Sequence, residues 1–182
     1  MIITGVDIET TGLEFSEHRI IEIYIGHWSM ESRKLVGEYV TRIDPKRSIT
    51  EKSQRVHGIS LADLMGMPDW ETVAPIAHRE LHRGDFLVAH NGIGFDFEFL
   101  DSEFQRVRLP RLAKPKIDTM LQANWATPNG KSPNLGELAF ACEVPYDASR
   151  AHAADYDVKV MMECFFKGYD WGFFKLEEPL AA

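Results

Sequence analysis

Four acidic side chains and one histidine are the residues of this chain whose types and spacing could do chemistry. Asp7 and Glu9 stand two residues apart in the apolar segment VDIETTGL. On a β-strand this spacing puts both carboxylates on one face, about 7 Å apart, where they could share a metal ion. Ile8 would then face the packed side of the sheet, and Gly12 would let the chain turn sharply past the site. The alternative is a pair of acids at a solvated strand end.

A third acid, Asp96, lies in VAHNGIGFDFEFL, where an apolar strand is expected to lead into a helix. Phe95, Phe97, Phe99 and Leu100 surround it with apolar side chains, and a carboxylate in such a place needs a partner. The alternative is that Asp96 only caps the helix, because Asp is a favoured N-cap residue.

The fourth acid, Asp157, falls beside the apolar stripe of the last expected helix, and the nearby Asp155 is expected on its solvated surface. His152 and Asp157 would lie about 140° apart if both were helical. His152 is therefore expected in a loop or first turn, free to reach into a cleft, although a single histidine before a helix is more often structural than catalytic.

Together, these residues match the needs of a two-metal phosphodiester site. Carboxylate oxygens are suitable ligands for Mg²⁺ or Mn²⁺, and a histidine is a suitable base. We therefore expect Asp7, Glu9, Asp96 and Asp157 as metal ligands for two ions, with His152 beside them.

The elements that must position these residues follow from apolar periodicity. Alternation predicts an antiparallel meander over 2–9, 19–29 and 34–43. Later strands, at 86–90 and ending near Ile117, alternate with helices, which favours parallel pairing. Helices are expected at 48–58, 60–66 with Ser60 as N-cap, 70–83 with Asp69 as N-cap, 95–107, from Asp118 onward, 135–143 and 153–167. The result is an α/β domain with a mixed five-stranded sheet flanked by helices.

Composition narrows the class of protein further. The 182 residues, 45% of them hydrophobic, fit one compact domain. The net charge of −8 argues against a broad basic surface for nucleic acid, although two divalent cations would offset half of it. Cys142 and Cys164 are expected as buried free thiols. Because no signal peptide or membrane-spanning run is apparent, a cytoplasmic location is expected.

Three segments of the chain resemble the exonuclease motifs of the DEDDh (DnaQ-like) 3′→5′ exonuclease family. DIETTGL is similar to the first motif, AHNGIGFDFEFL to the second, and HAADYD to the third, with a histidine five residues before the aspartate. RVHGIS and KIDTM also resemble segments between the motifs. The three residues between Asn91 and Phe95 are one more than in epsilon-type proofreading subunits and closer to the three-prime repair exonucleases.

The resemblance implies a ribonuclease H-like fold and a role for each residue. Asp7 would bridge both metals, Glu9 and Asp157 would complete the first, and Asp96 would help to hold the second. His152 would be the general base. The positions implied to contact the terminal nucleotide are Thr10, Leu13, His57, Asn91 and Phe95, and Asp118 would be a structural acid capping the following helix.

The resemblance also implies a substrate with a free 3′ end, released as nucleoside 5′-monophosphates. Single-stranded DNA is the favoured substrate, and RNA is the alternative. A different class of function, a nonhydrolytic scaffold subunit of a polymerase or repair complex, is also considered. A proofreading, repair or end-trimming role and the oligomeric state stay open. We expect one exonuclease domain over residues 1–182, whose short aromatic segment 168–182 packs on the domain or, alternatively, binds a partner.

Overall fold

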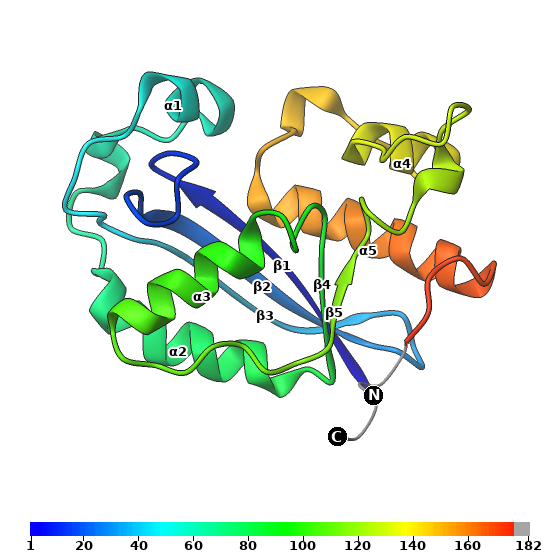
Figure 1. Cartoon of the computed structure of the whole chain (residues 1–182), viewed down its shortest axis with the longest axis horizontal. Helices are drawn as coiled ribbons and strands as arrows, with labels where there is room; N and C mark the ends of the chain where they lie inside the picture. The colour runs from blue at the N-terminus through cyan, green and yellow to red at the C-terminus, as the bar shows by residue number, and fades with distance from the viewer. Residues whose placement is uncertain (177–182) are drawn as a thin grey trace.

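The computed structural model describes residues 1–176 and has a mixed five-stranded sheet at its centre, in the order β3-β2-β1-β4-β5 (Figure 1). The first three strands pair antiparallel, and β4 and β5 run parallel to β1. The strands are β1 (Ile2–Thr10), β2 (Ile20–Ser29), β3 (Leu35–Arg42), β4 (Phe86–Ala89) and β5 (Lys116–Asp118). The predicted mixed sheet, with its meander and its parallel strands, is confirmed.

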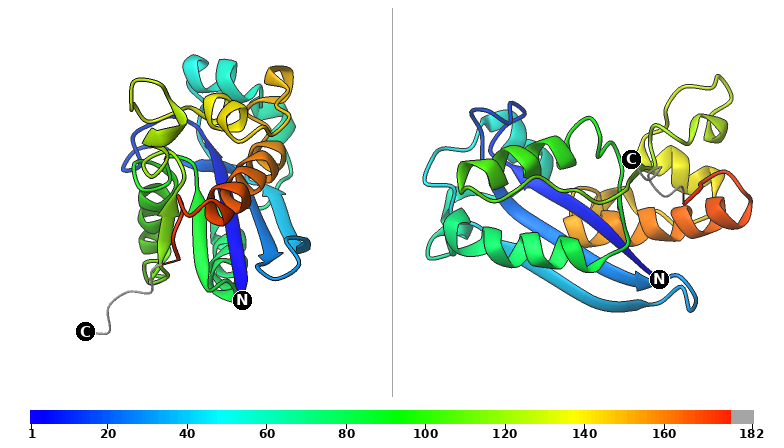
Figure 2. Two further views of the ribbon diagram at one scale, coloured as in Figure 1. Left: turned by 90° about the vertical axis from the view of Figure 1, so that its right-hand side faces the viewer. Right: turned by 60° about the horizontal axis from the view of Figure 1, so that its bottom comes forward.

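Helices cover both faces of this sheet (Figure 2). The α-helices are α1 (Glu51–His57), α2 (Trp70–Arg83), α3 (Asp96–Arg106), α4 (Leu135–Ala141) and α5 (Ala154–Asp170). Three short 3₁₀ segments are η1 (Leu61–Leu64), η2 (Asn124–Ala126) and η3 (Ala148–Arg150). Asp69 caps α2 as predicted, and Ser60 caps η1, a 3₁₀ turn where a helix was expected.

The alternation of side chains along the strands builds two apolar cores. On β4, Phe86 and Val88 join the core under α4 and α5, whereas Leu87 and Ala89 join the core under α2 and α3. On β1, a Cβ added at Gly5 would lie 2.7 Å from Val158 of α5, so this face of the strand closely approaches the helix. Asp7 and Glu9 follow Gly5 at the same two-residue period and therefore lie on the α5 side of the sheet.

One local prediction was wrong: no helix begins at Asp118, because turns follow it and then η2. The alternative that Asp96 only caps the helix is not supported, since Asp96 is the first residue of α3 and Phe95 is the N-cap. The chain bends at residues 11–13, and a side chain at Gly12 would collide with the His18 ring, which lies 2.3 Å from the position of its Cβ.

The end of the described chain packs on the domain. The Phe173 ring stacks on Trp125 with centroids 4.3 Å apart, and Phe174 is buried against Phe165. Residues 177–182 of the predicted aromatic segment lie outside the described part of the chain. No helix within residues 1–176 is long and apolar enough to cross a membrane.

Candidate active site

The carboxyl ends of β1 and β4 meet the N-terminal ends of α3 and α5 at one end of the sheet (Figure 1). β1 supplies Asp7 and Glu9, α3 supplies Asp96, and α5 supplies Asp157. Parallel neighbours end at the same edge, and α/β proteins place their ligand sites there. The four acids that the sequence singled out are therefore brought to one place.

The two acids of β1 lie where charge is poorly tolerated. Burial, followed by the charges of Asp96, Glu9, Asp157 and Glu22, raises the pKa of Asp7 well above its ordinary value. Burial and the neighbouring Glu22 raise the pKa of Glu9 to about 8. Ionisation of either carboxyl is therefore costly unless a cation is close by.

Asp96 reaches back to β1 from the first turn of α3. Its Oδ1 accepts a hydrogen bond from the backbone N–H of Ile8, with an N···O distance of 3.2 Å. The side chain is 3% exposed, and this burial raises its pKa to about 7 in spite of the backbone hydrogen bonds that it accepts. The bond to Ile8 fixes Asp96 beside the two acids of β1.

Asp157 and His152 form a local unit at the start of α5. The backbone N–H of His152 donates to Asp157 Oδ2 at 2.8 Å, while Asp157 Oδ1 is buried without a hydrogen-bond partner. Burial raises the pKa of Asp157. His152 has a φ of 65°, in the left-handed region, and its side chain is exposed, so the histidine lies in the turn before the helix, as predicted.

These acids fit divalent cations in chemistry, although they do not form a finished cage. Among residues 1–176, no group of three or more His, Cys, Asp or Glu side chains is already arranged to hold a metal ion. Mg²⁺ needs fewer protein ligands than a complete cage supplies, because it keeps several waters and is commonly bound by one or two carboxylates plus substrate phosphate. The unpartnered Asp157 Oδ1 and the mutually repelling carboxyls are the donors that such an ion would satisfy.

A cavity of about 300 Å³ gathers most of the predicted site. The five residues expected to contact a terminal nucleotide line it together with three of the acids and the histidine: Thr10, Leu13, His57, Asn91 and Phe95, with Asp7, Glu9, Asp96 and His152. Asp157 lines a second cavity that shares Asp7 and His152 with the first. The geometry brings the predicted residues together, and their individual roles stay predictions.

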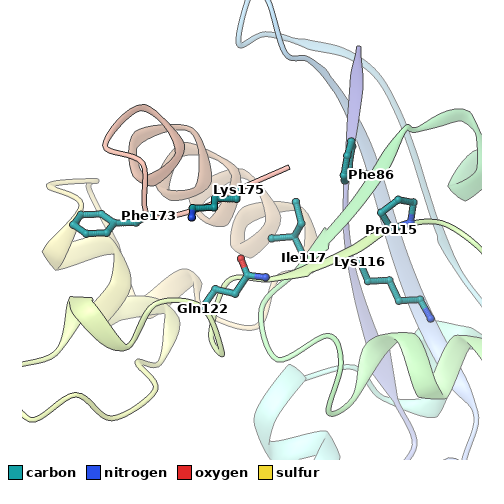
Figure 3. A pocket seen from close by; sticks show the side chains of 7 residues that line it. All are labelled: Phe86, Pro115, Lys116, Ile117, Gln122, Phe173 and Lys175. Atoms are coloured by element: carbon teal, nitrogen blue, oxygen red, sulfur yellow. The ribbon is translucent and has the colours of Figure 1, made fainter. Parts of the chain in front are cut away.

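A third cavity, of about 550 Å³, lies at the opposite end of β4 and β5 and has a different character (Figure 3). Phe86, Ile117 and Phe173 supply apolar walls, and Lys175 and Gln122 supply polar groups. It contains no acid and no histidine, so it cannot provide the metal chemistry described above.

Sequence reasoning missed several residues that shape the site. His90 lines both cavities at the acids, and Glu22 stands opposite Glu9 on β2. The antiparallel pairing of the expected strands could have found Glu22, since cross-strand partners are close neighbours. Nothing local to His90 distinguishes it from a structural histidine: its ring bonds Thr119 at 3.0 Å.

Asp118 holds the loop beside the acids in place through backbone hydrogen bonds. Its carboxylate accepts backbone hydrogen bonds from Asn91 and Ile93, at 3.1 and 2.9 Å, and from Met120 and Leu121 in the turn that follows it. It thereby fixes the loop from β4 to α3, which has Asn91 in the left-handed region. A structural role was predicted for Asp118, but the helix that it was expected to cap is absent.

This fold, with acids at the ends of β1, α3 and α5, defines a ribonuclease H-like nuclease of the DEDD type, a class of metal-dependent phosphodiester hydrolases. The family model described as "Exonuclease", of the RNase T type, matches residues 4–165. The chain therefore belongs to the RNase T/DnaQ-like exonuclease family.

Curated relatives agree with this assignment. A PolC-type DNA polymerase III of Ureaplasma parvum is 36% identical over 160 residues, which is 87% of this chain and 11% of that protein. The DNA polymerase III subunit epsilon of Treponema pallidum is 30% identical over 162 residues, 89% of this chain and 74% of the subunit. The chain thus spans about a tenth of the PolC-type relatives and about three quarters of the epsilon subunit.

Solved structures share the fold. An exonuclease I structure superposes with a TM-score of 0.79 at 17% identity, over 93% of this chain and 41% of that one. A zinc-bound complex of E. coli exonuclease I with single-stranded DNA gives 0.81 at 17% identity, over 93% and 40%. At this level of identity the likeness establishes the fold alone.

Proposed function

We propose that this protein is a 3′→5′ exonuclease that releases nucleoside 5′-monophosphates from the 3′ ends of single-stranded DNA. The observation that carries the proposal is the 300 Å³ cavity, in which three carboxyls and a histidine face side chains suited to one terminal nucleotide. Leu13 and Phe95 offer apolar contacts for a base, and the acids lie where its phosphate would enter.

In this proposal the acids and the histidine have separate roles, metal binding and proton transfer. Asp7, Glu9, Asp96 and Asp157 would hold two Mg²⁺ or Mn²⁺ ions, which supply positive charge that lowers the pKa of water and stabilises the leaving oxygen. His152 takes a proton from the attacking water. The new bond joins that water oxygen to phosphorus, and the bond from phosphorus to the 3′ oxygen of the preceding nucleotide breaks in line with it.

The products balance this step. The released nucleotide keeps the phosphate on its 5′ oxygen, and the shortened strand ends in a 3′ hydroxyl after its oxygen takes up a proton. Because the shortened strand again carries a free 3′ hydroxyl, degradation continues one nucleotide at a time. The net charge of −8 favours short, distributive engagement of the strand.

The relatives support a replication context for this activity. The similarity to a polymerase III epsilon subunit and to PolC-type polymerases supports a polymerase as partner and proofreading as the role, with DNA repair as an alternative. A cytoplasmic location is part of the same proposal, and both cysteines are buried free thiols, as a reducing compartment allows.

One digestion series tests the proposal. Single-stranded DNA, duplex DNA and RNA of one sequence, labelled at the 5′ end, are incubated with the protein and Mg²⁺, beside a circular single strand. The expected result is a ladder shortening from the 3′ end, fastest on single-stranded DNA. Faster digestion of RNA would move the protein to the exoribonuclease branch, internal cuts in the circle would contradict an exonuclease, and inactivity on every substrate would favour a scaffold.

A further inference from the structure

Two histidines of α2 take no part in the site described so far. His78 and His82 are four residues apart in the helix, about one turn, so their side chains are neighbours on one face. Their ring centroids are 4.2 Å apart, and the ring planes are tilted by 37°. The last turn of α2 leads into the start of β4, whereas the acids gather at the carboxyl end of that strand (Figure 1). The pair therefore lies toward the opposite end of β4 from the candidate active site.

The hydrogen bonds of the pair fix which nitrogen of each ring carries the proton. His78 Nε2 lies 3.1 Å from the carbonyl oxygen of Pro110, and His82 Nδ1 lies 2.8 Å from the carbonyl oxygen of His78. A carbonyl oxygen can only accept, so each of these two nitrogens is the N–H of its ring. In the neutral rings the lone pairs are therefore on His78 Nδ1 and His82 Nε2. Neither of these atoms makes a hydrogen bond to another residue in the range 1–176.

Both rings are held in place by their surroundings. Phe104 packs edge-on against His78, with ring centroids 5.0 Å apart and planes at 88°. Histidines that bind a metal ion almost always donate their other ring N–H to a backbone carbonyl, a carboxylate or water, which fixes the orientation of the ring. Both histidines already make that supporting hydrogen bond, to Pro110 and to the helix backbone. Little ordering of the side chains is left for a ligand to impose.

The spacing and the charges around the rings suit one shared ion. Metal–nitrogen bonds of about 2.0–2.1 Å put two imidazole centroids roughly 4.5 Å apart when the two bonds meet at a right angle. The observed 4.2 Å is close to that value. Imidazole is a ligand of Zn²⁺, Cu²⁺ and Ni²⁺, and right-angled coordination is typical of the last two. The neighbouring Arg79 and Arg83 both pair with Glu80, at 3.5 and 2.7 Å, which reduces their repulsion of a cation.

We propose that His78 Nδ1 and His82 Nε2 bind one divalent transition-metal ion of the imidazole-preferring class, with water in the remaining coordination positions. The site is distinct from the acid cluster, whose oxygen ligands suit Mg²⁺ or Mn²⁺. The ion joins one turn of α2 and, through the hydrogen bond from His78 to Pro110, the loop that follows α3. It stabilises the folded protein, because the unfolded chain does not hold the two rings together.

The first test reads the site directly in the unchanged protein. Ni²⁺ is titrated into the full chain in excess Mg²⁺, and the ring signals of its seven histidines are followed by NMR. The paramagnetic ion should broaden the signals of His78 and His82 first and together, with His57 and His152 affected only at higher concentration. Without Ni²⁺, the nitrogen shifts should show the proton of His78 on Nε2 and that of His82 on Nδ1. The opposite tautomer in either ring, or earlier broadening of His152, would overturn the inference.

The second test asks whether the two rings bind one ion jointly. His78→Gln and His82→Gln should each lower the affinity for Ni²⁺ about 10²-fold or more, because two ligands on one rigid element act as a chelate. The double variant should lower it little further. Arg79→Gln, which lies between them and keeps both imidazoles, is the matched control and should leave the affinity unchanged. If each single variant kept the affinity of the unchanged protein, the two histidines would not share an ion and the inference would be wrong.

Neither test depends on the exonuclease reaction. All of these variants should digest single-stranded DNA in Mg²⁺ at the rate of the unchanged protein, since the pair lies away from the acids. A Ni²⁺ site confirmed in a protein that digests nothing would leave this inference standing and refute the proposed function. Normal digestion with no specific binding at the pair would do the reverse.

Discussion

Helix α3 carries two buried aspartates five residues apart, and they lie in opposite surroundings. Asp96 and Asp101 are each 3% exposed. Asp101 accepts a hydrogen bond from the N–H of Leu112 at 2.7 Å and has Arg111 and Lys116 at 3.3 and 3.4 Å. Asp96 has the N–H of Ile8 and otherwise faces other acids, and its pKa is raised to about 7.

The difference separates acids that stabilise the fold from acids that we propose as ligands of a cation. A buried carboxylate with several donors or cationic partners contributes to stability, whereas one that has few donors and faces other acids costs free energy as soon as it ionises. Asp118, with four backbone donors, belongs with Asp101. Asp7, Glu9 and Asp157 belong with Asp96, because burial and neighbouring charge raise the pKa of each.

The largest expected effect comes from removing an acid of the second kind. Asp7→Ala should lower turnover about 10³-fold or more, because several kcal/mol of metal-derived charge stabilisation depends on it. Asp155→Ala is the matched control: its carboxylate is paired with Lys159 at 3.0 Å, and its turnover should stay near that of the unchanged protein. Equal losses in a single-turnover assay would mean that the third motif has been placed in the wrong register.

His152 should give the next largest effect. Its replacement by Ala should lower kcat about 10²- to 10⁴-fold, the size of a general-base contribution, with DNA binding largely retained. His57→Ala, in the same cavity, should instead act mainly on KM, because its predicted contact is with the nucleotide. If His152→Ala kept full turnover, the histidine would serve the turn before α5 and not the chemistry.

The sequence predicted which acids lie together, but it predicted their surroundings poorly. Asp7 and Glu9 share a face because alternation along a strand is a local property, and it was read correctly. The helix expected after Asp118 is absent, although the carboxylate accepts from Met120 and Leu121 as a capping acid would. Its bond to the N–H of Asn91, 27 residues earlier, is a long-range contact that no local pattern records. Tyr146 lies in a loop with no periodicity, so the sequence gave no signal that it would line the same cavity as Asp7 and Asp157.

A smaller effect should appear in stability, with opposite signs for the two aspartates of α3. Asp101→Asn should lower the free energy of unfolding by about 1–3 kcal/mol, since it weakens the ion pairs to Arg111 and Lys116 and places an amide against Leu112 N–H. Asp96→Asn should raise the stability of the metal-free protein, because it removes a buried carboxyl that repels its neighbours. Thermal melting in EDTA measures both, and shifts of the same sign would remove the distinction between the two kinds of acid.

The smallest effect, and the one that probes the whole acid cluster, is the pH dependence of metal-induced stability. In the metal-free folded protein the raised pKa values, about 8 for Glu9 and about 7 for Asp96, keep protons on carboxyls that the unfolded chain has already lost at pH 6. The folded state therefore binds more protons than the unfolded state, and its stability falls as pH rises from about 4.5 to 8.

Bound Mg²⁺ needs the ionised carboxylates, so it must displace those protons, and it binds more tightly at pH 8 than at pH 6. The melting temperature in Mg²⁺ minus that in EDTA should accordingly be larger at pH 8, with a change of about 2–4 °C for each kcal/mol of difference. EDTA should also stop turnover, and added Mg²⁺ or Mn²⁺ should restore it.

In the double variant Glu9→Gln, Asp96→Asn, the pH dependence of the metal-free melting temperature should flatten between pH 6 and 8. A melting difference that stays constant from pH 6 to 8 would show that these carboxyls are already ionised without metal, and the contrast with Asp101 would then rest on geometry alone.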